Sequence, residues 1–162
     1  MITVRLANDG DIAGILEIYN DAVLNTVATF DTVPRTLEKQ TEWYAQHGGA
    51  YPVIVAEQEG QVIGWASLTR YSDRLAYART AEISLYIRDG YRGQGLGKKL
   101  MERILEEGKK AGPHTVLSRI VEGNDSSIHL HRLYGFDLVG TMRQVGFKFG
   151  RLLDVVMMQK ML

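Results

Sequence analysis

The sequence contains no cysteine, no long apolar run and no excess of either charge. Without cysteine the chain can form no disulfide and no thiolate metal site, and it has no thiol nucleophile, which fits a reducing cytoplasm. No apolar segment approaches the roughly 20 residues that span a bilayer, and residues 1–6 have the pattern of a short strand rather than of a signal peptide. Nineteen basic residues balance nineteen acidic ones. We therefore expect a cytoplasmic protein that binds neither nucleic acid nor membrane.

What the sequence does contain is enough apolar material for one core. The chain has 162 residues, of which 45% are hydrophobic, and no linker, repeat or low-complexity segment divides it. We expect a single domain over residues 1–162. The histidines have no spacing typical of metal ligands, so no metal is expected.

Periodicity and turn residues predict alternating strands and helices. Strands are expected at 2–6, 51–57, 61–69, through Glu82 in the centre, at 114–122, and as a final antiparallel pair turning near Phe149-Gly150. Helices are expected after the caps of residues 8–11, from Thr36 to about His47, from about Gly95 to Ala111, and from Asn124 to Tyr134. The resulting order, βααβββαβαββ, is that of an α/β protein.

Residues 81–100 run from a strand through a glycine-rich turn into a helix. Gly93, Gly95 and Gly97 lack a Cβ, so the turn can adopt positive φ angles and direct backbone N–H groups at an anion, which the start of the helix also attracts. No Lys-Ser or Lys-Thr pair ends the turn, which excludes a P-loop, and the third glycine of a dinucleotide fingerprint is missing. On this spacing alone, an ordinary strand-to-helix turn remains an alternative.

Two motifs resemble the GNAT superfamily of N-acetyltransferases. Arg92-x-x-Gly95-x-Gly97 resembles its coenzyme A pyrophosphate loop. The segment from Asn124 to Phe136 resembles Asn-x-x-Ala-x-x-x-Tyr-x-x-x-Gly-Phe, with Ser127 at the alanine position and His131 at the tyrosine position. The resemblance implies the GNAT fold, an α/β (α+β) architecture in which helices flank a mixed central β-sheet with a splayed middle strand. It also implies acetyl-CoA as co-substrate, bound by Leu85, Tyr86, Ile87, Arg92, Gly93, Gln94, Gly95, Leu96, Gly97, Lys98, Asn124 and Ser127.

Further residues narrow the resemblance to the phosphinothricin and methionine sulfoximine acetyltransferase branch. They are Thr29-Phe30, Ala76-Tyr77, Thr80-x-Glu82 and Gly146-Phe-Lys-x-Gly150. Such proteins acetylate the free α-amino group of small amino acids or their analogues, a small-molecule amine substrate, and usually form homodimers. Many relatives carry a tryptophan where this chain has Leu152, so dimer packing or pocket shape there can differ.

Glu82 is the candidate general base. Alternation along the central strand places Ala81 and Ile83 on one face and Glu82 on the other. A carboxylate in a central strand is costly unless it is solvated or has a function, and here it can remove a proton from the substrate ammonium. The alternative is a structural carboxylate paired with Arg79 or another cation.

His131 is the candidate acid, because it occupies the acid position of the motif and an imidazole can protonate the leaving thiolate near neutral pH. A packing role is the alternative. Backbone N–H groups around residues 85–87 are expected to hold the oxyanion. His47, His114 and His129 are interpreted as surface or packing residues.

The substrate pocket should offer an aromatic wall and a cation for the α-carboxylate. The candidates are Phe30 and Tyr77 for the wall, and Arg74, Arg79 or Arg70 for the cation. Phe30 as a core anchor and solvated arginines are the alternatives. For the whole protein, two other functions stay open: acetylation of a protein N-terminus or other amine, and a non-catalytic acetyl-CoA-binding regulatory module. The branch residues argue against the first, and Glu82 together with His131 argues against the second.

Overall fold

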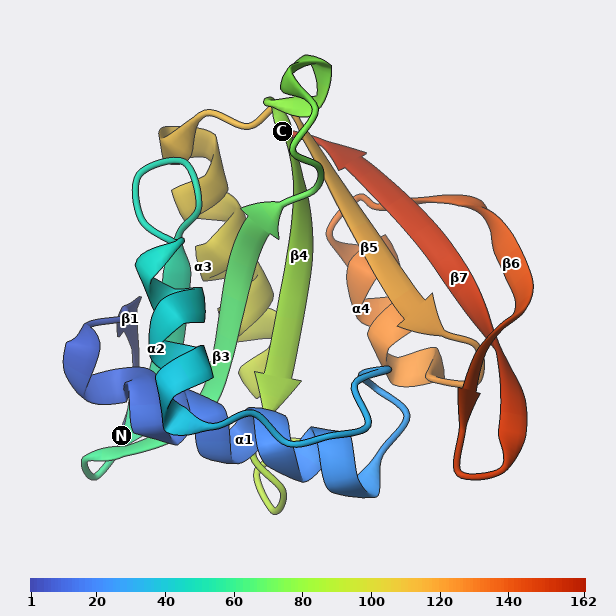
Figure 1. Cartoon of the computed structure of the whole chain (residues 1–162). Coiled ribbons are helices and arrows are strands. Elements are labelled where there is room, and N and C mark those ends of the chain that lie inside the picture. The colour runs from blue at the N-terminus through green and yellow to red at the C-terminus, as the bar shows by residue number, and fades with distance from the viewer.

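The strands and helices follow one another in the predicted order (Figure 1). The computed structural model describes all of residues 1–162. Its strands are β1 (Ile2–Leu6), β2 (Val53–Gln58), β3 (Gln61–Arg70), β4 (Thr80–Ile87), β5 (Thr115–Val121), β6 (Asp137–Lys148) and β7 (Arg151–Met161). Its helices are α1 (Ile12–Asn25), α2 (Leu37–Ala45), α3 (Leu96–Ala111) and α4 (Asp125–Leu133), with short 3₁₀ turns at Asp9–Asp11 and Leu75–Tyr77. The expected order is therefore confirmed.

Side-chain caps explain where several helices begin. The Asn8 side chain accepts a hydrogen bond from the Gly10 N–H at 2.9 Å, and the Asp11 carboxylate accepts one from the Asn8 N–H at 2.8 Å, which completes a capping box before α1. At α2 and α4 a single side-chain contact caps the helix, since Thr36 accepts from the Lys39 N–H and Asn124 from the Ser127 N–H. The sequence analysis placed the helix starts at these same polar residues, so the predicted helix starts are confirmed.

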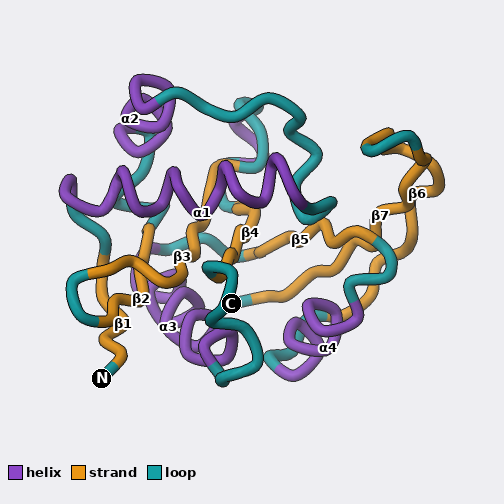
Figure 2. Tube along the Cα trace, turned by 90° about the horizontal axis from the view of Figure 1, so that it is seen from below, coloured by secondary structure: helices purple, strands orange, loops and turns teal.

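All seven strands belong to one mixed sheet, in the order β1-β2-β3-β4-β5-β7-β6. Neighbouring strands are antiparallel except β4 and β5, which run parallel. Figure 2 shows α1 and α2 on one side of the sheet and α3 and α4 on the other. None of the helices has the length and apolar character that crossing a bilayer requires.

Each face of the sheet has its own apolar core. The larger cluster lies between the sheet and α3 and includes Ala81 and Ile83 from β4, with Leu85 packed at its edge. The smaller cluster lies between the sheet and α1, and Tyr86 packs against it. The predicted alternation along β4 is therefore confirmed, and it leaves Glu82 on the side of the sheet that faces α1 and α2.

The sheet is split at its centre. β4 pairs with β3 along Ala81 to Ile87, but it pairs with β5 only from Thr80 to Glu82. Beyond Glu82 the two parallel strands diverge, as Figure 1 shows. The splayed middle strand implied by the resemblance is therefore present, and the β5-facing edge of residues 83–87 has no strand partner.

Candidate active site

The glycine-rich turn prepares the start of α3 for an anion. Gly93 and Gly95 have φ angles of 77° and 79°, and a Cβ at either position would meet nothing within 4 Å. Gly95 is the residue before α3, and no side chain caps the helix there. The first N–H groups of α3 are therefore left for an external acceptor, which fits a diphosphate.

One residue of this loop acts differently from the expectation. Gly97 lies inside the first turn of α3 without a positive φ, and its lack of a Cβ lets Leu130 of α4 approach, since an added Cβ would lie 3.3 Å from Leu130 Cδ2. The expectation that Gly97 supplies a positive φ is wrong. The Leu96 side chain is buried in the core, so only its backbone can face a ligand. The side chains of Arg92, Gln94 and Lys98 lie at or near the surface around the turn.

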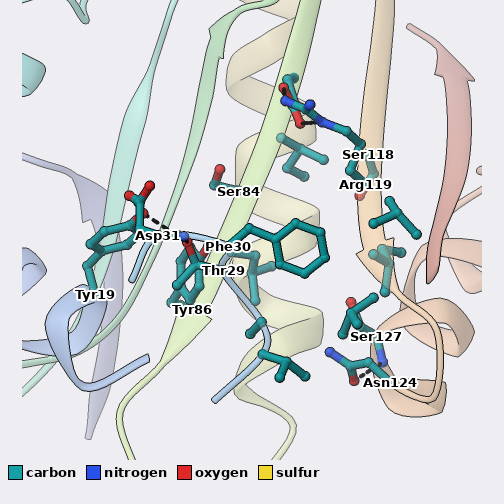
Figure 3. A pocket seen from close by; sticks show the side chains of 18 of the residues that line it. Tyr19, Thr29, Phe30, Asp31, Ser84, Tyr86, Ser118, Arg119, Asn124 and Ser127 are labelled. Atoms are coloured by element: carbon teal, nitrogen blue, oxygen red, sulfur yellow. Dashed lines mark hydrogen bonds and ion pairs between the residues drawn. The ribbon is translucent and has the colours of Figure 1, made fainter. Parts of the chain in front are cut away.

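A cavity of about 630 Å³ occupies the opening between β4 and β5. Its walls come from both faces of the sheet, because residues 82–86 of β4 and residues 118–121 of β5 line it together with α1, α4 and the loop that follows α1. Figure 3 shows Asn124 and Ser127 on one side of β4 and Tyr19 and Asp31 on the other, with Phe30 between them. The glycine-rich turn and the cavity thus flank the same unpaired stretch of β4.

Glu82 forms an ion pair across this opening. Its two carboxylate oxygens lie 2.6 Å from Nε and 2.6 Å from Nη2 of Arg119, a two-pronged contact. The hydrogen bonds to Glu82, together with its charge, raise the pKa of Arg119 above its ordinary value against the opposing effect of burial. The ion pair of the alternative interpretation is therefore present, with Arg119 as the cation in place of Arg79.

His131 is buried at the opposite face of the opening. Its Nδ1 lies 2.7 Å from the Ser127 carbonyl oxygen, so Nδ1 carries the hydrogen and donates. Nε2 must then accept from the Ser118 hydroxyl at 2.9 Å. Burial lowers the pKa of His131 below 6.5, partly offset by the hydrogen bond to Ser127. The ring is therefore neutral at pH 7, and it has to gain a proton before it can act as the expected acid.

Ser118 was missed by the sequence analysis. It is the polar member of a buried set on β5 that also contains Val116 and Ile120. A hydroxyl at an inward-facing strand position needs a hydrogen-bonding partner. A serine alternating with apolar residues on this strand was therefore a signal that could have identified Ser118.

Only part of the expected substrate pocket comes together. Phe30 lines the cavity, where its ring lies so close to Gly146 that an added Cβ would overlap it. Arg74, Tyr77 and Arg79 are exposed and do not line the cavity. The 3₁₀ turn at Leu75–Tyr77 holds this segment at the surface, and the Tyr77 ring packs on Tyr71 at 5.3 Å.

The guanidinium groups that do line the cavity belong to Arg35 and Arg119. Arg35 lies 4.1 Å above the Tyr19 ring, pairs with Asp31 at 3.6 Å and donates to Gln40 at 3.2 Å. The Tyr19 hydroxyl also bonds Asp31, and burial together with that carboxylate raises the pKa of Tyr19 to about 12. Neither arginine was among the sequence candidates, because nothing local in the sequence links them to β4.

The remaining histidines lie outside the cavity. His47 bonds the Trp43 carbonyl and Thr69, which is a packing role, while His114 and His129 are exposed. No group of three or more His, Cys, Asp or Glu side chains could hold a metal ion.

Comparison with known proteins gives consistent results. Residues 15–136 match the family model described as the acetyltransferase (GNAT) family. The chain is 42% identical to the L-methionine sulfoximine/L-methionine sulfone acetyltransferase of Pseudomonas aeruginosa, over 97% of this chain and 92% of that one. A phosphinothricin acetyltransferase from Sinorhizobium meliloti, solved with acetyl-CoA, has a TM-score of 0.95 and 37% identity over 99% and 88% of the two chains. A structure named ribosomal-protein-alanine N-acetyltransferase from Brucella melitensis has a TM-score of 0.95 and 40% identity over 99% of each chain.

Proposed function

The chain belongs to the GNAT acetyltransferase family, and from this premise we propose that it transfers an acetyl group from acetyl-CoA to the free α-amino group of a small amino acid or analogue. Methionine sulfoximine, methionine sulfone and phosphinothricin, the compounds in the names of its relatives, are the first substrates to test. The carrying observation is a cavity that crosses the sheet beside the unpaired stretch of β4, with Glu82 on one face and His131 on the other.

Acetyl-CoA supplies an activated acyl group on a thioester. The free N–H groups at the start of α3 fit its diphosphate, and the unpaired edge of residues 85–87 fits the segment that leads to the sulfur. Asn124 and Ser127 line the cavity on the same side as His131. We assign the amine to the other face, where Glu82, Phe30 and Arg35 lie.

Glu82 takes one proton from the substrate ammonium, which frees the nitrogen lone pair for attack. As the N–C bond forms and the C–S bond breaks, the nitrogen gives up a second proton and the sulfur needs one. Ser118 and His131 can carry it, because the Ser118 hydroxyl already donates to a neutral Nε2. His131 accepts this proton first and then returns it, so its acid role follows from a preceding role as acceptor.

The test is thiol release from acetyl-CoA with a panel of amines. The panel contains the three analogues, common amino acids, and a peptide that begins with alanine. Turnover with small amino acids or analogues and not with the peptide is expected. Turnover with the peptide alone would overturn the proposal in favour of a protein N-terminus, and acetyl-CoA binding without turnover on any amine would favour a regulatory module.

The proposal includes a homodimer that works in the cytoplasm to detoxify amino-acid analogues. Support for a dimer comes from the β6–β7 hairpin, which exposes the large apolar side chains Leu138, Val139, Met142, Val145, Phe147, Phe149 and Leu152. Apolar side chains gathered on one exposed element are typical of an interface. Light scattering after gel filtration should give twice the mass of one chain, and Phe147→Asp should shift it toward the monomer. The cysteine-free composition supports the cytoplasmic location.

A further inference from the structure

Glu82 and Arg119 place opposite charges in contact at the wall of the cavity. We propose that Arg119 binds the α-carboxylate of the substrate, and that the substrate exchanges one ion pair for two. The substrate ammonium pairs with Glu82, and the substrate carboxylate replaces Glu82 as the partner of Arg119. This inference rests on the proposed function and names the group that selects free amino acids.

The two side chains project from the same face of the sheet. Glu82 is in register with Leu117 in the parallel pair, so Glu82, Leu117 and Arg119 point to the same side, whereas Ser118 points to α4 and His131. Figure 3 shows Arg119 reaching from β5 toward β4 at the end of the cavity away from Asn124. The ion pair therefore bridges the two strands just where their backbone pairing ends.

Arg119 is the cavity cation that is free to change partners. Arg35, the other cation in the wall, is held by Asp31, Gln40 and the ring of Tyr19. Arg119 has Glu82 as its only hydrogen-bonding partner and uses Nε and Nη2, which leaves Nη1 unbound. Its side chain is 53% exposed. A carboxylate entering the cavity can therefore reach the guanidinium without disturbing the core.

The ion pair matches the charges of an amino acid. An α-amino acid carries an ammonium and a carboxylate on neighbouring atoms, so it can satisfy Glu82 and Arg119 together. The guanidinium keeps a two-pronged carboxylate contact throughout, which is its preferred geometry. An amine without a carboxylate cannot bind Arg119, and its ammonium has to compete with Arg119 for Glu82. The N-terminal residue of a protein is such an amine, because its carboxyl carbon is part of a peptide bond.

The exchange also affects Glu82. In the paired state both of its carboxylate oxygens accept hydrogen bonds from Arg119. Once the substrate carboxylate has replaced it, Glu82 lies beside the ammonium whose proton it removes. Selection of the substrate and release of the base are then the same event.

The test compares methionine sulfone with its primary amide, which keeps the amine and the side chain but lacks the charge. The wild type should prefer the acid. Arg119→Gln should lower kcat/KM for the acid by about 30-fold, mainly through KM, because the acid loses a charge-assisted contact. It should not lower kcat/KM for the amide, which makes no such contact and no longer competes with an ion pair. Arg132→Gln, which removes an exposed cation from α4, is the matched control and should change neither. Acetyl-CoA affinity, measured by calorimetry, should be equal in all three proteins.

The outcomes distinguish a failure of the proposed function from a failure of the role given to Arg119. If the wild type acetylates no amino acid or analogue, the proposed function fails. If it does, but Arg119→Gln loses equally on the acid and the amide, Arg119 only holds Glu82 and the inference is wrong. A selective loss in Arg74→Gln instead of Arg119→Gln would move the carboxylate to the surface loop. Should Arg119→Gln fold poorly, Arg119→Lys serves, since one ammonium cannot reproduce the two-pronged contact and the acid should still be lost selectively.

Discussion

The neutral imidazole of His131 accepts a hydrogen bond from the Ser118 hydroxyl, 2.9 Å away, within the buried wall of the cavity. Three contacts fix this ring, since Nδ1 donates to the Ser127 carbonyl and Phe136 packs edge-on against it at 4.8 Å. The orientation of His131 is therefore determined by the protein before any ligand arrives, and it makes Ser118 the group through which protons reach Nε2.

Ser118→Ala should remove that hydrogen bond and leave Nε2 buried without a partner. A buried acceptor without its donor costs about 1–3 kcal/mol, so the free energy of unfolding in urea should fall by that amount and turnover should fall with it. Ser67→Ala is the matched control, because Ser67 is also fully buried but its hydroxyl has no partner. The control should be neutral or slightly more stable. Equal losses in both variants would show that the Ser118 contact contributes nothing specific.

The pH dependence of the free energy of unfolding should depend on two histidines, His131 and His47. Burial lowers the pKa of His131 and of His47 below 6.5, so the unfolded chain binds more protons than the folded one as the pH falls below that value. The free energy of unfolding should therefore be flat near neutrality and decrease on acidification below about pH 6.5. His131→Gln should reduce this decrease, with the part due to His47 remaining. A series of urea titrations between pH 5 and 8 measures it, and an unchanged slope in the variant would contradict the assignment.

The same neutral imidazole should govern the rate. If His131 must first accept a proton, kcat should decline on the acidic side of the profile, with an apparent pKa below 6.5 that disappears in His131→Gln. A decline on the alkaline side that disappears in the variant would instead mean that the ring works from the charged form, as an acid from the outset.

Gly95→Ala tests the cofactor turn. The added methyl has open space, so its only cost is the φ of 79°, about 1–2 kcal/mol for a residue with a Cβ. Where the turn relaxes to avoid this angle, the N–H groups at the start of α3 move and acetyl-CoA should bind roughly tenfold more weakly. Gly60→Ala, with the same φ and the same open space in the β2–β3 turn, should lose similar stability and keep full affinity. Calorimetric titration of both variants with acetyl-CoA decides between a binding role and an ordinary turn.

Gly146→Ala tests whether Phe30 forms the wall of the amine site. The new methyl would overlap the Phe30 ring, so the ring must move or the hairpin must shift, at a cost of about 1–3 kcal/mol. We expect a several-fold rise in KM for the amine with acetyl-CoA affinity unchanged. Gly140→Ala, on the same strand with nothing near its Cβ, is the control. If both variants behave alike, Phe30 does not shape the site.

The sequence predicted the parts of the fold that depend on neighbours in the chain. Helix starts at Thr36 and Asn124 and the stop at Gly112 are local signals, and alternation was enough to place Glu82 opposite Ala81 and Ile83. The split between β4 and β5 came from the family resemblance alone, since no periodicity shows where two strands part.

The side-chain partners could not be predicted, because they meet across the sheet. Glu82 and Arg119 are 37 positions apart, and nothing near Arg119 distinguishes it from a solvated residue on a strand. Arg74 and Arg79, being nearer to Glu82 in sequence, were the natural candidates, yet the 3₁₀ turn directs their segment to the surface. Gly97 was expected to share the role of Gly95. It lies two residues further along the chain, however, and is already inside the helix, where the lack of a Cβ allows Leu130 to pack closely.

The early end of the pairing between β4 and β5 gives this protein an edge strand in the middle of its sheet. Outer edges invite foreign strands and thereby aggregation. This edge instead lies between the two halves of the sheet, and the ion pair between Glu82 and Arg119 bridges the strands at the point where they separate. Residues 83–86 on this inner edge thus line the cavity with backbone groups that have no strand partner.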